Sequence, residues 1–268
     1  MVGGGGAMPL TEFQDDILRL VGEPLADEAY LAGGAAIHFT PNSARYSNAL
    51  DLFHDSLQQV ASSFAIADTL LKQSGYTVTV ELSQPGFIRA IVRKGDDATL
   101  VDWAHDTAWR FMPLVVSPHG ARLLHPVDLA INKVLALAGR DEPRDFVDIL
   151  FIHEHTLPLG AMIWAATGKD PGFTPRSLLE LLKRRGHYRP EDFSRLDLAR
   201  PFDLPQAKQQ WLRALSEAEA FIASRPPEDV GCLYWDAAGE RFVAPFREQV
   251  ATVHFGSKGG VVPRTVPV

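Results

Sequence analysis

The sequence predicts an α/β protein in which a first half of mixed strands and helices is followed by a mostly helical second half. Three observations predict this fold class. Runs of β-branched and other apolar residues, bounded by turn residues, are concentrated between residues 50 and 103. Apolar residues at helical spacing dominate from residue 126 to residue 224. Apolar residues make up 46% and charged residues 22% of the 268 residues, so the chain can bury a core.

The first elements follow from spacing and from turn residues. Apolar side chains recur at helical spacing over residues 11–21, behind Thr11 as the expected N-cap. A glycine-rich turn follows, and the short apolar run at residues 50–53 predicts a buried strand. Residues 56–72 show the helical period again, and Gly75 is placed to end that helix.

The middle and the end of the chain differ in period. Three β-rich segments separated by turn residues predict an antiparallel meander over residues 76–82, 86–93 and 98–103. Helices are then expected at about residues 126–139 and 143–153, and over residues 159–167, 175–185 and 205–224. A small hairpin is expected from residues 232–235 and 241–243.

These elements predict two domains. We expect a flexible leader over residues 1–9, an α/β domain over residues 10–155 and a helical domain with the hairpin over residues 156–250. The glycine- and proline-containing tail, residues 251–268, is expected to be loosely held or docked on a partner.

Composition excludes several classes of protein. No stretch approaches the roughly 18 consecutive apolar residues of a membrane span, so we expect a soluble protein with no membrane partner. The single cysteine, Cys232, excludes an internal disulfide framework and a thiolate zinc cluster, and it fits a reducing cytoplasm. The net charge of −7 means that any contact with nucleic acid must come from local patches.

Two features of the first half suggest a phosphate site. Backbone amides at a glycine-rich turn such as Gly33-Gly34 favour anions, although a glycine pair is often only a tight turn. Asp51 and Asp102 each interrupt an apolar strand, where a carboxylate is costly to bury without an ion partner. The two aspartates form a candidate magnesium site. Alternatively, both lie at strand ends and face water.

A second informative segment runs from Lys133 to Asp148. Lys133 interrupts a helix whose other face is apolar, which by itself predicts a solvated or snorkelling lysine whose loss changes stability little. Asp145 and Asp148 are three residues apart and share a helix face. Arg144 and Asp145, at the expected helix start, fit capping and ion pairing equally well.

Taken together, these segments resemble the AbiEii toxin-like nucleotidyltransferases, a family in the polymerase-beta-like nucleotidyltransferase superfamily. The glycine pair, followed by Arg45-x-Ser47 and then Leu50-Asp-Leu-Phe-His-Asp55, is similar to the family's first motif. Pro126-Val-Asp-Leu-Ala130, with Lys133, Arg140, Pro143-Arg-Asp145 and Asp148, is similar to its later motif. Gly168 to Pro175 resembles a subgroup feature, and the likeness covers roughly residues 10–220.

The resemblance implies a nucleotidyltransferase-fold mixed sheet with flanking helices, packed against a helical domain. It also implies transfer of a nucleoside monophosphate from an NTP, with Mg²⁺ or Mn²⁺, to RNA (tRNA by analogy) or to a protein. Proteins of this family commonly have a partner antitoxin. The resemblance implies that Asp51, Asp102 and Lys133 are catalytic and that Asp51 and Asp102 bind the metal ion. It implies a supporting role for Asp145 and Asp148. The nucleotide- or phosphate-binding residues that it implies are Gly33, Gly34, Ser47, Lys133, Arg140 and Arg144.

One position departs from the family pattern. The family places two acidic residues on the strand with one residue between them, because that spacing puts both on one face. Here the first position is Ala49, and only Asp51 remains. The family pattern then leaves Asp51 and Asp102 to bind one ion, while the ion that activates the acceptor hydroxyl loses a ligand. Two alternatives to an active enzyme follow: a pseudoenzyme that binds a nucleotide or a partner, and a bare scaffold.

A basic segment in the second half is a candidate RNA contact. Tyr188 and Phe193 lie among its cations, a mixture typical of single-stranded RNA sites. Alternatively, helix C-termini attract basic residues for electrostatic reasons alone. The cations are Lys183, Arg184, Arg185, His187, Arg189 and Arg195.

Overall fold

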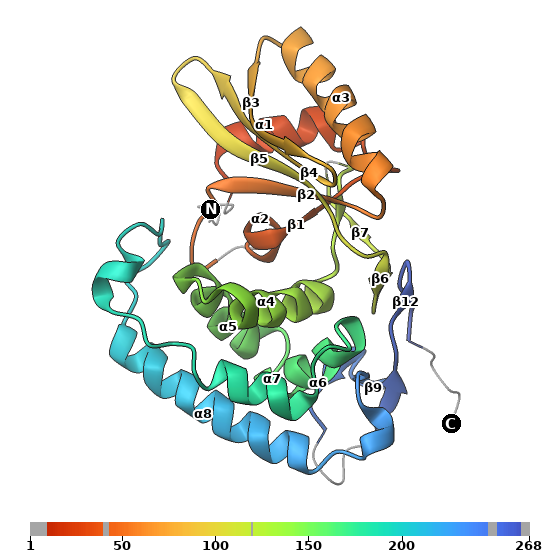
Figure 1. Ribbon diagram of the computed structural model, residues 1–268, viewed down its shortest axis with the longest axis vertical. Helices are drawn as coiled ribbons and strands as arrows, with labels where there is room; N and C mark the ends of the chain where they lie inside the picture. Colours follow the sequence, from red (N-terminus) through yellow and green to blue (C-terminus); the bar gives the residue numbers. More distant parts are fainter. Residues whose placement is uncertain (1–9, 40–42, 119, 246–250, 264–268) are drawn as a thin grey trace, which may run out of the picture. The chain divides into compact units, whose positions relative to one another are not determined.

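The computed structural model describes residues 10–39, 43–118, 120–245 and 251–263 (Figure 1). The predicted leader, residues 1–9, and the last residues of the predicted tail, 264–268, lie outside the described residues.

The chain packs into two compact units. Unit 1 comprises Met1–Ala108, Leu114–His125 and Asp197–Arg200. Unit 2 comprises Trp109–Pro113, Pro126–Leu196 and Pro201–Val268. Residues 126–155 therefore pack with unit 2, whereas the sequence analysis assigned them to the first domain. The domain boundaries themselves stay a prediction.

A seven-stranded mixed sheet forms the centre of unit 1, in the order β3-β4-β5-β2-β1-β8-β7. The β2–β5 and β1–β8 pairs are parallel, and the other neighbours are antiparallel. The predicted meander is present as β3, β4 and β5. The strands are β1 (Tyr30–Ala32), β2 (Ala49–His54), β3 (Thr77–Gln84), β4 (Phe87–Lys94), β5 (Asp97–His105), β7 (Val115–Val116) and β8 (Arg122–Leu123).

Two helices pack against one face of this sheet (Figure 1). In α1 (Glu12–Val21) the predicted N-cap is present, because the Thr11 side chain accepts the Gln14 backbone N–H and completes a capping box. In α3 (Leu57–Gln73), Phe64 contacts Trp103 of β5 edge-on at a centroid distance of 5.1 Å. Trp103 is 1% exposed. The buried side chains of β2, β4 and β5 on the face of the sheet that carries Trp103 therefore form the unit 1 core.

Unit 2 is mostly helical. Phe146, fully buried in α5, packs against Tyr188 and against Trp211 of α8. A second core cluster joins Trp164 of α6 to Cys232. The elements are α4 (Pro126–Arg140), α5 (Pro143–His155), α6 (Leu159–Lys169), α7 (Pro175–Leu182), η1 (Pro190–Phe193), α8 (Leu204–Ala223) and η2 (Pro227–Asp229).

Short strands complete unit 2. The predicted hairpin is present as β9 (Leu233–Asp236) and β10 (Arg241–Val243). β11 (Thr252–His254) adds a third strand beside β9, and β12 (Ser257–Lys258) pairs with β6 (Trp109–Arg110). The expectation of a loosely held tail is therefore wrong for residues 252–258, because backbone ladders bind this segment to unit 2.

Among the described residues, no single helix is long and apolar enough to cross a membrane. Counted together, α5 and α6 are long and apolar enough by length and composition alone, but the chain bends by 113° between the two helices.

Candidate functional site

The two aspartates predicted as metal ligands lie side by side in unit 1. β2 and β5 are parallel neighbours whose register sets Asp51 opposite Asp102. Residues directly opposite each other on neighbouring strands project from the same face of a sheet. Asp102 alternates with Trp103, which packs on α3, so both aspartates project from the opposite face. We call this face, with Asp51 and Asp102, the site face.

The glycine pair packs directly on this site. Gly33 joins β1 to the short helix α2 (Gly33–Ile37) with φ +61°, a conformation that glycine adopts without strain. A Cβ atom on Gly33 would collide with the Asp51 carboxylate. A Cβ atom on Gly34 would lie 2.5 Å from Arg45 Nη2 and 3.2 Å from Ser47 Oγ. The absence of side chains here therefore brings the turn backbone next to three polar groups.

Local hydrogen bonds hold Arg45 and Ser47 in place. Ser47 Oγ donates to the Ala49 carbonyl at 2.9 Å, and Gln14 Nε2 of α1 donates to the Ser47 carbonyl at 2.8 Å. Arg45 is 5% exposed, and its Nη1 donates to the Tyr46 carbonyl at 3.0 Å. A buried guanidinium beside a glycine turn adds a fixed positive charge, which favours an anion there.

A third charged residue, Arg89 of β4, lies in the same transverse row of the sheet. The antiparallel register of β4 and β5 sets Arg89 opposite Asp102. Arg89 Nε donates to Asp102 Oδ1 at 2.7 Å, and Nη2 donates to Oδ2 at 2.6 Å. Both carboxylate oxygens of Asp102 are thus engaged by one planar guanidinium.

The Lys133 segment forms a buried ion-pair network between α4 and α5 of unit 2. Lys133 Nζ lies 2.8 Å from Asp145 Oδ1 and 2.8 Å from Asp148 Oδ2. Arg140 donates to both oxygens of Asp145, at 2.6 and 2.9 Å. The side chain of Lys133 is 7% exposed, and both aspartates are fully buried. The expectation of a solvated lysine is therefore wrong, because two carboxylates draw Lys133 into the helix interface.

The electrostatics of this network keep Asp145 ionised. Burial by itself raises the pKa of Asp145, but hydrogen bonds and charges from Arg140 and Lys133 outweigh it, so the pKa of Asp145 is lowered. Arg144, the other predicted arginine, is exposed on the first turn of α5.

Asp128, from the same sequence motif, has a structural role within unit 2. Its carboxylate accepts the backbone N–H groups of Phe111 at 2.7 Å and Met112 at 3.0 Å. Burial raises the pKa of Asp128 to about 6. This residue ties the segment around β6 to the first turn of α4.

Residues 16–238 match the family described as nucleotidyl transferase AbiEii toxin of type IV toxin–antitoxin systems. The chain belongs to this family. The match confirms the resemblance found in the sequence.

Solved structures of similar fold include two bacterial proteins. MenT4, a nucleotidyltransferase toxin from Mycobacterium tuberculosis H37Rv, superposes with a TM-score of 0.50 at 16% identity, over 81% of this chain and 83% of MenT4. JHP933 from Helicobacter pylori gives a TM-score of 0.49 at 16% identity, over 80% of this chain and 95% of that protein. No curated protein sequence matches the chain. The likeness to MenT4 confirms the predicted fold class.

Nucleotidyltransferases of this kind generally use divalent metal ions, so the site face of this AbiEii-family chain is the place to test the fit of such ions. Ala49 projects beside Asp51 and supplies no oxygen. Asp102 has both oxygens on Arg89. Within the described ranges, no group of three or more histidine, cysteine, aspartate or glutamate side chains is arranged to hold a metal ion. The residues present do not fit the two-ion site that the family implies.

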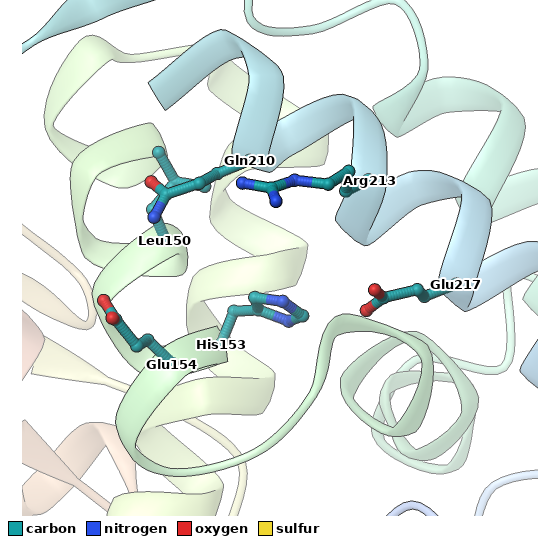
Figure 2. Close-up of a pocket in the computed structure, with 6 residues that line it drawn as sticks. All are labelled: Leu150, His153, Glu154, Gln210, Arg213 and Glu217. Carbon is teal, nitrogen blue, oxygen red and sulfur yellow. The ribbon is translucent and has the colours of Figure 1, made fainter. Parts of the chain in front are cut away.

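A separate pocket of about 210 Å³ lies between α5 and α8 of unit 2 (Figure 2). The backbone N–H of Leu159 donates to His153 Nδ1 at 3.0 Å, and burial lowers the pKa of His153. The imidazole is therefore neutral at pH 7 with its proton on Nε2, and Figure 2 shows the ring pointing toward Glu217. The lining residues are Leu150, His153, Glu154, Gln210, Arg213 and Glu217.

The basic segment does not present its aromatic residues to a ligand. Tyr188 and Phe193 are buried against Phe146, and Tyr188 Oη donates to Asp141 at 2.6 Å. Arg185 donates to the Ala138 carbonyl at 2.5 Å. The stacking part of the RNA-contact hypothesis is therefore wrong, because these rings form the unit 2 core.

The predicted site residues fall into two groups. Unit 1 brings together Gly33, Gly34, Ser47, Asp51 and Asp102, and unit 2 brings together Lys133, Arg140, Asp145 and Asp148. The expectation that Asp51, Asp102 and Lys133 meet at one metal–triphosphate spans both units and stays a prediction.

Sequence reasoning placed Arg45 in the family motif without assigning it a role, and it missed Arg89 altogether. The signal for Arg89 was a charged residue inside the apolar run Phe87–Val92, the same signal that identified Asp51 and Asp102. Its partner was hidden because strand register, which sets Arg89 opposite Asp102, is a tertiary property.

Proposed function

We propose that this AbiEii-family chain binds a nucleoside triphosphate at the site face of unit 1 and transfers its nucleoside monophosphate to RNA, with tRNA as the first candidate, or to a protein side chain. The observation that carries the proposal is that the glycine pair, at the C-terminal end of β1, packs on Asp51 of β2, which in turn lies opposite Asp102 of β5. Family membership supplies the reaction class.

The roles of the unit 1 residues follow from their chemistry. The backbone of Gly33 and Gly34 lets the β- and γ-phosphates approach closely, because no side chain stands in front of it. Arg45 supplies a fixed positive charge beside that backbone, and Ser47 supplies a hydroxyl oxygen. Asp51 is the carboxylate proposed to accept the proton of the acceptor hydroxyl.

The unit 2 network has a different proposed role. Lys133 and Arg140 carry two positive charges that Asp145 and Asp148 balance, so the formal charges of the network cancel. We propose that Asp145 and Asp148 fix the position and orientation of the Lys133 ammonium within unit 2. Arg144, exposed at the start of α5, remains a proposed phosphate contact.

The proposed reaction conserves atoms and charge. The oxygen of the acceptor hydroxyl bonds to the α-phosphorus, the bond from that phosphorus to the bridging β-phosphate oxygen breaks, and pyrophosphate leaves. The hydroxyl proton passes to the Asp51 carboxylate. The acceptor then carries a nucleoside monophosphate through a phosphodiester bond.

The family also suggests a setting for this activity. The chain belongs to a toxin family of type IV toxin–antitoxin systems, so we propose that it acts as a toxin opposed by a cognate antitoxin. NTPs and tRNA are cytoplasmic, and we propose that the protein works there.

A second candidate function is nucleotide or partner binding without turnover. Ala49 in place of an acidic residue, together with the engagement of Asp102 by Arg89, favours it. Both changes remove metal ligands and leave the glycine pair, Arg45 and Ser47 intact. Such a protein would hold a triphosphate and leave it unreacted.

One incubation separates the two functions. The full chain is incubated with each α-labelled NTP, Mg²⁺ or Mn²⁺, and total RNA, and the label is followed on RNA and on protein. The active enzyme labels an acceptor, and Asp51→Asn abolishes that labelling. ATP or GTP binding without any labelled product supports the pseudoenzyme. Absence of both binding and labelling contradicts both candidates and leaves the fold as a scaffold.

A further inference from the structure

Three charged side chains form one row across three neighbouring strands of the site face. Arg89 of β4 lies opposite Asp102 of β5, and Asp102 lies opposite Asp51 of β2. The row consists of one guanidinium followed by two carboxylates, and Asp102 is its centre. The register fixes this row, because slipping one strand by one residue would send its side chain to the opposite face of the sheet.

Several contacts fix Arg89 in this row. Its two hydrogen bonds to Asp102 are 2.6 and 2.7 Å long, which is short for a charge-assisted pair. Its guanidinium carbon lies 5.5 Å from the centre of the Phe87 ring, on the same strand. Hydrogen bonding to Asp102 raises the pKa of Arg89, and the charges of Asp102, Asp51 and Glu81 add to that effect.

A divalent cation and this guanidinium compete for the same oxygens. A metal ion bound by Asp102 needs at least one of the two oxygens that Arg89 engages, and it would bring two further positive charges next to the guanidinium. Ala49 offers no compensating carboxylate on the neighbouring position of β2. The side chains therefore favour the Arg89 guanidinium over a divalent metal ion as the partner of Asp102.

We propose that Arg89 takes the place of a metal ion in this protein: it holds Asp102 in a bidentate ion pair, excludes a divalent cation from the Asp51–Asp102 pair, and leaves a nucleoside triphosphate to bind without a metal ion there. The part of this inference that concerns the nucleotide rests on the proposed function. The part that concerns metal exclusion rests only on the row of side chains.

The test of metal exclusion uses no nucleotide. Mn²⁺ binding to the full-length protein is measured by calorimetric titration and by the loss of the free-ion electron paramagnetic resonance signal. The variants are Arg89→Met, which keeps the length of the side chain without its charge, and Arg89→Met combined with Asp102→Asn. Arg93→Met is the matched control, because Arg93 is an exposed residue on the same face of β4.

We expect weak Mn²⁺ binding by the wild type and by Arg93→Met, at least tenfold tighter binding by Arg89→Met, and a return to the wild-type level in the double variant. Equal Mn²⁺ affinity of wild type and Arg89→Met overturns the proposal. If Arg89→Met does not fold, the single variant Asp102→Asn decides the question. An unchanged Mn²⁺ affinity in that variant supports metal exclusion. A tenfold loss of Mn²⁺ affinity shows that Asp102 already binds the ion in the wild type and overturns the proposal.

A second titration tests the nucleotide part. We expect the affinity of the wild type for ATP to differ less than threefold between a buffer with EDTA and one with Mg²⁺. In EDTA, Arg89→Met should bind ATP at least tenfold more weakly than the wild type, and Mg²⁺ should restore part of that affinity. Wild-type ATP binding that collapses in EDTA overturns the metal-independent part. Absence of ATP binding under both conditions contradicts the proposed function, while the Mn²⁺ result still decides on metal exclusion.

Discussion

Ala49 projects from the same face of β2 as Asp51, because one residue separates them on the strand. The resemblance to the family leads us to expect a carboxylate at this position, and the methyl group of alanine supplies neither charge nor oxygen. We therefore expect this residue to bear directly on whether the chain is an active enzyme or a pseudoenzyme. Restoring a carboxylate on a backbone that is already in place tests that role with a single substitution.

Ala49→Asp should raise both the Mn²⁺ affinity and the transfer of labelled nucleotide to an acceptor by about tenfold or more. Loss of a group that only supports a metal ligand commonly costs about tenfold in metal affinity or activity, so gain of a direct ligand should have at least that effect. Without metal, the variant should be less stable than the wild type because two carboxylates then lie side by side, and metal with NTP should restore its stability. Labelled-NTP incorporation and thermal unfolding measure the two effects.

Ala49→Asn is the matched control, because it adds an oxygen without a charge. Efficient transfer by the wild type, unchanged in Ala49→Asp, would mean that another carboxylate such as Asp55 or Asp106 completes the site.

Gly33 shows how backbone geometry positions the same site. Gly33→Ala should cost about 1–2 kcal/mol for the left-handed backbone conformation alone. The new methyl group also collides with the Asp51 carboxylate, so ATP affinity should fall together with stability. Chemical denaturation and ATP titration measure both.

Gly95→Ala is a control for the backbone cost, because Gly95 has the same φ of +61° and no atom within 4 Å of the added methyl group. It should lose a similar amount of stability and keep its ATP affinity. If Gly33→Ala binds ATP normally, the glycine pair is only a turn.

Between elements, the ion pairs of Lys133 join α4 to α5. Lys133→Met should lower the free energy of unfolding by about 3–5 kcal/mol, because it leaves the buried charges of Asp145 and Asp148 without their shared partner. This reverses the expectation from the sequence, in which the lysine was solvated and its loss nearly neutral. Urea denaturation at pH 7 measures the change.

Two further variants test that explanation. Asp148→Asn in the Lys133→Met background should recover part of the loss, since Asp145 keeps Arg140 and no unpaired carboxylate remains. Arg144→Met, exposed on α5, should stay within about 0.5 kcal/mol of the wild type. A stability loss in Arg144→Met as large as that in Lys133→Met would point to general charge effects rather than to the buried network.

Over the whole molecule, buried histidines make stability depend on pH. Burial lowers the pKa of His125 to about 4, and it also lowers the pKa values of His54, His153 and His254. As pH falls below about 6.5, the unfolded chain takes up protons that the folded chain refuses, so stability falls. Asp128, whose pKa is raised to about 6, opposes this between pH 6 and 4 because its protonated form is favoured in the fold.

We therefore expect stability to be highest above pH 7 and to fall between pH 6.5 and about 4. His125→Gln should reduce that loss by about 1 kcal/mol, a value that allows for solvent screening of a partly exposed ring. His187→Gln, at an exposed position, should leave the profile unchanged. Unfolding free energies measured from pH 8 to pH 4.5 provide the test, and a flat profile for the wild type would contradict it.

Most elements of the fold could be predicted from local pattern. Thr11 marked the start of α1, the β-branched runs marked β3 to β5, and helical spacing marked α4 to α8. The strands that were missed, such as β1, β6 and β8, are two or three residues long and too short to show a period. The role of residues 252–258 was missed because their partners in β9 and β6 are distant in the sequence.

The sequence by itself determined the family and the fold class, because motif spacing and hydrophobic period are local properties of the chain, and the site residues that it named stay a prediction. Tertiary structure alone decided the partners of the charges. Strand register placed Arg89 on Asp102, and helix packing buried Lys133 between two aspartates. A charge is stable in an apolar environment only with a partner, and the fold, which brings residues 12 or 13 positions apart into contact, chooses that partner.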